Sequence, residues 1–137
     1  MKLTRSAITV SVALLVALTL AASGAATTRV VNVGLAKNGK SVTLHRGYLL
    51  VVSLRGNATT GYAWELKSVN RSLLKPLGVS YVPDANPTHL VGRGGVYKLR
   101  FRATAPGATM LRLNYARGKQ LGGSYRLRVV VSGPIPV

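Results

Sequence analysis

The sequence predicts an all-β protein, an immunoglobulin-like β-sandwich of about seven to eight short strands. Short apolar runs recur along the chain, and several alternate apolar with polar residues, the period of a strand with one buried face. Gly, Pro and Asn separate these runs as turn residues do. Beyond residue 26 no segment keeps the spacing of an amphipathic helix. The expected strands are 29–33, 41–44, 48–54, 61–66, 79–82, 95–104, 109–115 and 125–131.

The strands expected in the first half of the chain are short and rich in β-branched and apolar residues, which favour a pleated, half-buried surface. After 29–33, the pair Asn38-Gly39 indicates a tight turn before the extended segment 41–44. The run 48–54 follows a second turn. In 61–66 alternate residues share one face of the strand, namely Tyr62, Trp64 and Leu66.

In the second half, Pro and Gly set the expected boundaries. Residues 74–77 contain Pro76, so we expect a connection there, and Pro83 ends the next strand. We expect Gly122-Gly123 to end a loop before the last strand. Basic and apolar residues alternate in the later strands, so we expect one solvated face, with Lys98, Arg100, Arg102, Arg126 and Arg128, and one core face, with Tyr97, Phe101, Tyr115 and Tyr125.

The N-terminal residues have the layout of a secretory signal peptide. Lys2 and Arg5 precede an apolar run at 8–20, and small residues follow at 21–26. The run is shorter than the ~20 apolar residues of a membrane span, although an uncleaved anchor is the alternative. We therefore expect a signal peptide at 1–26, a single exported domain at 27–137 in the periplasm or outside the cell, and no membrane segment after cleavage.

The charge is strongly positive. Nineteen Lys and Arg residues face two acidic residues, for a net charge of +17. Such a surface attracts polyanions, so binding to envelope polysaccharide or nucleic acid stays an open alternative. The basic residues are spread along strands, however, and this favours a solvated sheet surface. The aromatic residues are expected in the core, which argues against a base-stacking platform.

The sequence lacks the usual equipment of an enzyme. His45 and His89 are its two histidines, and no serine stands in a nucleophile-elbow pattern. Asp84, His89 and Ser80 have the residue types of a catalytic triad, but we do not expect them to form one. Neither a metal-ligand cluster nor a phosphate-binding glycine motif is present. We therefore expect no enzymatic activity, no metal and no cofactor.

Three segments are expected to form exposed loops at one end of the sandwich, at 57–62, 89–95 and 116–123. The first reads Asn57-Ala58-Thr59-Thr60-Gly61-Tyr62-Ala63-Trp64 and resembles the signature loop of chagasin-type inhibitors of cysteine peptidases, with Ala58 where Pro is commoner. Gly92-Arg93-Gly94-Gly95 resembles the second loop of that family. The third loop departs from the family pattern, because Arg117-Gly118-Lys119 stands where Arg-Pro-Trp is usual.

The resemblance implies a monomeric, reversible inhibitor of papain-like cysteine peptidases that blocks the active-site cleft with three loops. The small residues of the first loop would lie over the catalytic cysteine, and loss of the third-loop aromatic would weaken binding. A basic sandwich that binds anionic polymers, or an adhesion module, is the alternative. The peptidase-binding residues that the resemblance implies are Asn57, Ala58, Thr59, Thr60, Gly61, Tyr62, Gly92, Arg93, Gly94, Gly95, Arg117, Gly118 and Lys119.

Overall fold

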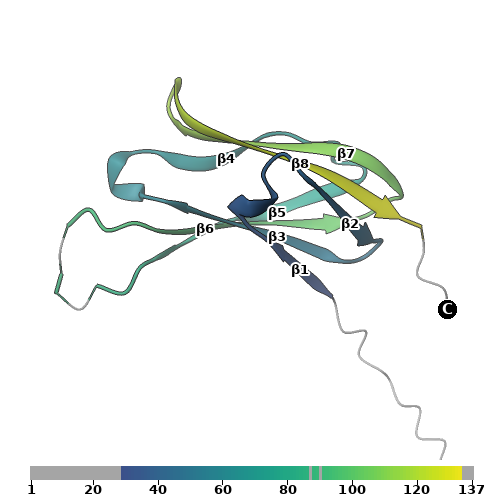
Figure 1. Ribbon diagram of the computed structural model, residues 1–137, viewed down its shortest axis with the longest axis horizontal. Coiled ribbons are helices and arrows are strands. Elements are labelled where there is room, and N and C mark those ends of the chain that lie inside the picture. The colour runs from purple at the N-terminus through teal and green to yellow at the C-terminus, as the bar shows by residue number, and fades with distance from the viewer. Residues whose placement is uncertain (1–28, 87, 90, 134–137) are drawn as a thin grey trace, which may run out of the picture.

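The computed structural model describes residues 29–86, 88–89 and 91–133, and the expected signal peptide lies outside them. Two four-stranded sheets pack face to face as a sandwich, which confirms the predicted fold class (Figure 1). The first sheet has the order β1 (Val30–Val33), β3 (Leu49–Gly56), β6 (Gly95–Ala103), β5 (Leu74–Pro83). The second has the order β2 (Ser41–His45), β8 (Gln120–Ser132), β7 (Gly107–Arg117), β4 (Ala63–Ser68).

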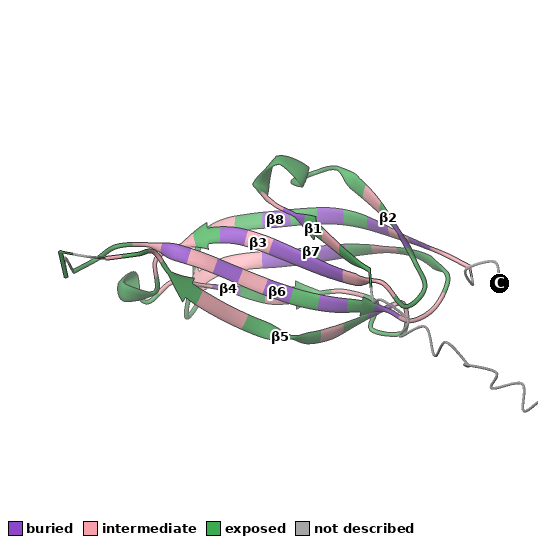
Figure 2. Cartoon of the chain, turned by 90° about the horizontal axis from the view of Figure 1, so that it is seen from below, coloured by how far each residue is buried: buried purple, intermediate pink, exposed green. Residues whose placement is uncertain are grey.

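The core lies between the two sheets and follows the alternation in the sequence. Figure 2 shows buried residues recurring along β6 and β8 between exposed or half-buried ones. The predicted orientation of the aromatic residues is confirmed, because Tyr97, Phe101 and Tyr125 are buried and Tyr115 packs against the core. In the described part of the chain, no helix is long and apolar enough to cross a membrane.

The segment 74–77 is a strand, so the expected connection was wrong. Residues 74–83 form one continuous strand, β5, which pairs with β6 and has a bulge between Pro76 and Gly78. Pro76 cannot donate a backbone hydrogen bond, but β5 is the edge strand of its sheet and has a partner on one side only. The position at the edge, which local sequence does not reveal, makes the proline acceptable.

The turn predicted at Asn38-Gly39 is present, and it carries the chain from one sheet to the other. A short 3₁₀ turn, η1 (Leu35–Lys37), precedes it, and the side-chain oxygen of Asn38 accepts a 2.9 Å hydrogen bond from the backbone N–H of Arg126. The first two strands therefore do not pair with each other. Each lies parallel to a later strand instead, β1 to β3 and β2 to β8.

Tyr125 makes the stability of the fold sensitive to alkaline pH. Its hydroxyl donates a 2.9 Å hydrogen bond to the carbonyl oxygen of Gly34, and burial raises its pKa from 10.0 to about 12. Because the folded pKa is the higher one, this stabilisation is complete below about pH 10 and is lost as the pH rises towards 12. Urea titrations at intervals between these values should show a fall in unfolding free energy that is smaller in Tyr125→Phe. An equal fall in both proteins would contradict the assignment.

Candidate functional site

Three connections between strands gather at one end of the sandwich, as predicted (Figure 1). They are the segment between β3 and β4, the loop between β5 and β6, and the tip of the β7–β8 hairpin. The strand pairing brings them together, since β3 and β6 meet at Gly56 and Gly95, and β4 and β7 meet at Ala63 and Ala116. We call the described residues 57–62, 91–94 and 117–119 the loop end.

The first segment of the loop end is a short 3₁₀ turn, η2 (Ala58–Thr60), held by its own side chains. The side-chain oxygen of Asn57 caps the turn, accepting hydrogen bonds from the backbone N–H of Thr59 at 3.1 Å and from its hydroxyl at 2.6 Å. The Thr60 hydroxyl donates to the Asn57 carbonyl oxygen at 2.6 Å. Gly61 ends the turn at a φ of 80°, in the left-handed region that glycine adopts without strain. Residues 58–61 are all exposed.

Asn57 also joins this turn to the second loop and to the sheet. Its side-chain amide donates a 2.8 Å hydrogen bond to the carbonyl oxygen of Gly92, across 35 residues of sequence. Its backbone N–H donates to the hydroxyl of Tyr115 on β7, also at 2.8 Å. One half-buried side chain therefore sets the position of the exposed turn relative to its neighbour.

Arg117, at the end of β7, joins the turn to the hairpin tip. Its guanidinium donates to the Thr60 carbonyl oxygen at 3.4 Å and to the Gln120 side chain at 2.8 Å. The same group lies over the ring of Tyr62, 5.0 Å from the ring centroid, in a cation–π contact. A Cβ on Gly61 would come within 3.0 Å of Cδ of Arg117, so the glycine also makes room for this side chain.

A stack of aromatic side chains supports the loop end from below. The ring of Tyr115 lies between those of Tyr62 and Trp64, with centroid separations of 5.4 and 5.1 Å. The Trp64 indole N–H donates to the carbonyl oxygen of Arg55 at 2.9 Å, and the Tyr97 hydroxyl donates to that of Tyr62 at 3.1 Å. Trp64 is 8% exposed, which confirms that it belongs to the core.

An ion pair holds the second loop where it leaves β5. Asp84 and Arg55 form an ion pair, and the hydrogen bond from Arg55 holds the pKa of Asp84 below its ordinary value. The backbone N–H of Asp84 donates to the Gly94 carbonyl oxygen at 3.0 Å. The Arg93 side chain folds back to the Ala85 carbonyl oxygen, also at 3.0 Å. Because Asp84 is paired with Arg55, the structure gives no support to a catalytic triad of Asp84, His89 and Ser80.

The glycines of the second loop have different surroundings. Gly92 is exposed at a φ of 81°, and no atom would lie within 4 Å of an added Cβ. Gly94 is half-buried, and a Cβ there would lie 2.9 Å from the Gly56 carbonyl oxygen. Gly95 is buried in β6, where a Cβ would collide with the Val82 carbonyl oxygen. Gly95 therefore lets β5 and β6 approach, and the structure does not place it on the surface.

The third loop is shorter than the predicted 116–123. β7 extends to Arg117 and β8 begins at Gln120, which leaves Gly118 and Lys119 as an exposed two-residue turn. Gly122 and Gly123 lie inside β8, and the ladder shifts register where Tyr115 faces Gly123 and Ala116 faces Leu121. A Cβ on Gly122 would lie 2.9 Å from the Tyr62 ring. The glycines thus mark a bulge packed on an aromatic ring instead of a loop.

Sequence reasoning missed the residues that support the loops from outside them. Tyr115 on β7 and Arg55 on β3 each contact a loop residue, although neither belongs to a loop. Tyr115 was expected only as a core residue, and its hydroxyl bond to Asn57 has no signal in the sequence. In the described ranges no three His, Asp or Glu side chains come together as metal ligands would.

Comparison with known proteins shows that this chain is similar to inhibitors of peptidases. The family model for the chagasin family peptidase inhibitor I42 matches residues 43–129. Amoebiasin-1 of Entamoeba histolytica is 32% identical over 80 residues, covering 58% of this chain and 76% of that protein. Chagasin of Trypanosoma cruzi is 31% identical over 87 residues, covering 60% of this chain and 76% of that protein.

Two solved structures share the fold. The cysteine protease inhibitor EhICP2 of Entamoeba histolytica superimposes with a TM-score of 0.67 at 20% identity, over 77% of this chain and 98% of that one. The solution structure of Amebosin gives a TM-score of 0.63 at 27% identity, over 76% and 98%. The family match spans more than half of the chain, and both curated relatives are more than 30% identical. This protein therefore belongs to the chagasin family of peptidase inhibitors.

Proposed function

We propose that this protein is a reversible inhibitor of papain-like cysteine peptidases and that its loop end enters the active-site cleft. The observation that carries the proposal is the exposed turn at residues 58–61. The side chain of Asn57 joins this turn to Gly92 of the second loop, and the side chain of Arg117 joins it to the hairpin tip. Membership of an inhibitor family supports the activity. The assignment of individual contact residues is part of the proposal.

The turn suits a narrow cleft for two physical reasons. Thr59, Thr60 and Gly61 carry little side-chain volume, so the backbone can approach the catalytic cysteine closely. The hydrogen bonds of both threonine hydroxyls to Asn57 already restrict the turn, so less conformational entropy is lost on binding. A turn held in this shape can cover the nucleophile without presenting a peptide bond in the geometry needed for cleavage.

The hairpin tip is the part that departs from the family pattern. Arg117 and Lys119 put two positive charges there, which would speed association with an enzyme whose cleft rim is acidic. No tryptophan follows Arg117, and Arg117 covers the Tyr62 ring instead. Because aromatic anchors often carry much of an interface, we expect weaker inhibition than by a relative with the full third loop.

The activity is tested by titrating the purified protein against papain and cathepsin L. We expect competitive, reversible inhibition that needs no metal or cofactor. With one monomer bound per enzyme, the stoichiometry should be one to one. Unchanged activity of both enzymes at micromolar inhibitor would refute the proposal.

We also propose that the protein is exported, with residues 1–26 removed as a signal peptide and the inhibitor domain beginning at residue 27. This would place the inhibitor in the periplasm or outside the cell. N-terminal sequencing of protein from the periplasm and the medium should give a start near residue 27. Recovery only from the cytosol, with Met1 or Lys2 at the start, would contradict it.

A further inference from the structure

The outer face of the β2-β8-β7-β4 sheet carries a group of cations that folding does not explain. Arg112 on β7 stands directly opposite Arg126 on β8, and the next outward position of β8 is Arg128. All three side chains are exposed. Like charges directly opposite each other destabilise an antiparallel pair. This pair therefore does not help to hold the sheet together.

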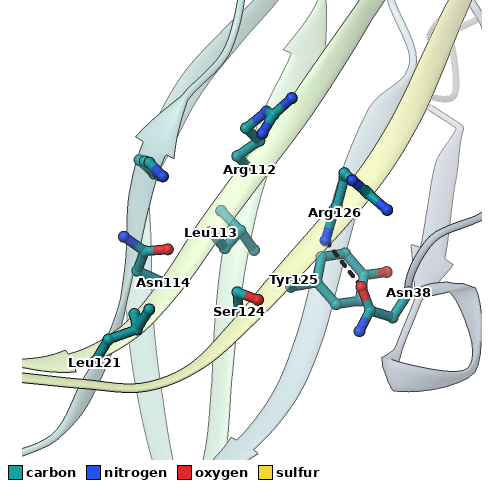
Figure 3. Close-up of a pocket in the computed structure, with 9 residues that line it drawn as sticks. Asn38, Arg112, Leu113, Asn114, Leu121, Ser124, Tyr125 and Arg126 are labelled. Atoms are coloured by element: carbon teal, nitrogen blue, oxygen red, sulfur yellow. Dashed lines mark hydrogen bonds between the residues drawn. The ribbon is translucent and has the colours of Figure 1, made fainter.

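The sheet is also hollowed along this row. A depression of about 400 Å³ is lined by nine residues, among them Lys67, Arg112 and Arg126 (Figure 3). A second depression of about 210 Å³ includes Lys40, Arg126 and Arg128 in its lining. Arg126 lines both depressions, so they adjoin on this sheet, and we call the cations that line them the basic track (Lys40, Lys67, Arg112, Arg126 and Arg128).

The acidic residues leave the basic track uncompensated. The chain has two of them, and Asp84 is paired with Arg55 at the base of the second loop. Glu65 on β4 is exposed and lies opposite Asn114, so it borders the track on one side. It lines neither depression, and its single negative charge is outnumbered by the five cations of the track. The track is therefore suited to a ligand that carries several negative charges in a row.

The neutral residues that line the larger depression indicate the class of that ligand. Asn114 and Ser124 line the larger depression and can exchange hydrogen bonds with sugar hydroxyls, and the side-chain NH2 of Asn38 can donate to them (Figure 3). The aromatic residue in that lining, Tyr125, is 1% exposed, so it offers no ring face on which a base could stack. This combination favours a polysaccharide over a nucleic acid.

We propose that the basic track binds an acidic polysaccharide, with carboxylate or sulfate groups paired to the arginines. The track lies on a sheet face, whereas the loop end lies at the end of the sandwich. Bound polysaccharide would therefore hold the inhibitor at an anionic surface with its loop end exposed. This goes beyond the proposed inhibition and does not depend on it.

The test measures binding of labelled polygalacturonate by fluorescence anisotropy, at about 50 and about 200 mM salt. Arg112→Ser/Arg126→Ser/Arg128→Ser should weaken binding at least about tenfold at the lower salt and make its salt dependence shallower. The matched control is Lys98→Ser/Arg100→Ser/Arg102→Ser, which removes the same charge from β6 in the other sheet. It should change binding by less than about threefold.

Each outcome decides the proposal. Equal loss in both triple variants would show attraction by bulk charge only and would overturn the site. Single-stranded DNA of equal charge that binds as tightly as polygalacturonate would overturn the choice of polysaccharide. Thermal melts check folding, and Arg112→Gln/Arg126→Gln replaces the first variant if it does not fold. Inhibition of papain is measured on the same proteins and should be unchanged in both triple variants. Loss of inhibition and loss of polysaccharide binding can then be told apart.

Discussion

Replacing Thr60 with phenylalanine is expected to raise the inhibition constant for papain by at least about a hundredfold, equivalent to ~2.7 kcal/mol of binding free energy. The side chain is exposed, and its hydroxyl holds the turn by donating to the Asn57 carbonyl oxygen. A large ring would remove that bond and would keep the backbone of the turn away from the catalytic cysteine. The inhibition constant is measured by titration, with circular dichroism to confirm that the protein is folded.

Thr43→Phe is the matched control for this variant. Thr43 is an exposed threonine on β2, a strand that takes no part in the loop end. The same change of residue there should leave the inhibition constant within about twofold of the starting protein, since surface substitutions away from special features have small effects. A Thr60→Phe variant that inhibits as well as the Thr43→Phe variant would show that the first loop does not enter the cleft.

Trp64→Ala is expected to lower the free energy of unfolding by about 3–5 kcal/mol. The indole is 8% exposed, packs on Tyr115 with a 5.1 Å centroid separation, and donates to the Arg55 carbonyl oxygen. Alanine removes the ring, leaves a cavity and takes away the indole hydrogen bond to the half-buried Arg55 carbonyl oxygen. The loss is measured by urea unfolding followed by far-ultraviolet circular dichroism, because the chain has no second tryptophan to serve as a fluorescent probe.

The same substitution should also weaken inhibition, because Tyr115 supports Asn57 through its hydroxyl. Trp64→Phe keeps an aromatic ring against Tyr115, so it should lose less stability than Trp64→Ala and retain more inhibition. A Trp64→Ala protein with normal stability would contradict the core assignment. Normal inhibition by a folded but destabilised variant would show that the aromatic stack does not position the turn.

Much of the fold could be predicted because the sandwich repeats a local rule. Along β6 and β8 alternate residues are apolar, and these became the core, including Phe101 and Tyr125. The predictions failed where local signals compete with position in the sheet. Pro76 indicated a connection but lies in an edge strand, and Gly122 indicated a loop but lies in a bulge.

The sequence was equally informative about the position of the candidate site. The run from Asn57 to Gly61 indicated a compact exposed turn, and the structure has one. Its supports were not predictable. Tyr115 is 58 residues from Asn57, and Arg117 is 57 residues from Thr60. Contacts at such separations depend on strand register, which no local pattern encodes.

By itself the sequence determined the class of fold, the residues that face the core and the turn that marks the family, because period-two alternation and turn chemistry act between near neighbours. Only the tertiary structure decided how the outward residues are shared between surfaces. Lys98, Arg100 and Arg128 looked equivalent as solvent-facing cations, yet the first two lie on β6 and the third on β8, in different sheets. Alternation tells which residues point outwards, but strand pairing over long separations decides which face of the sandwich they occupy.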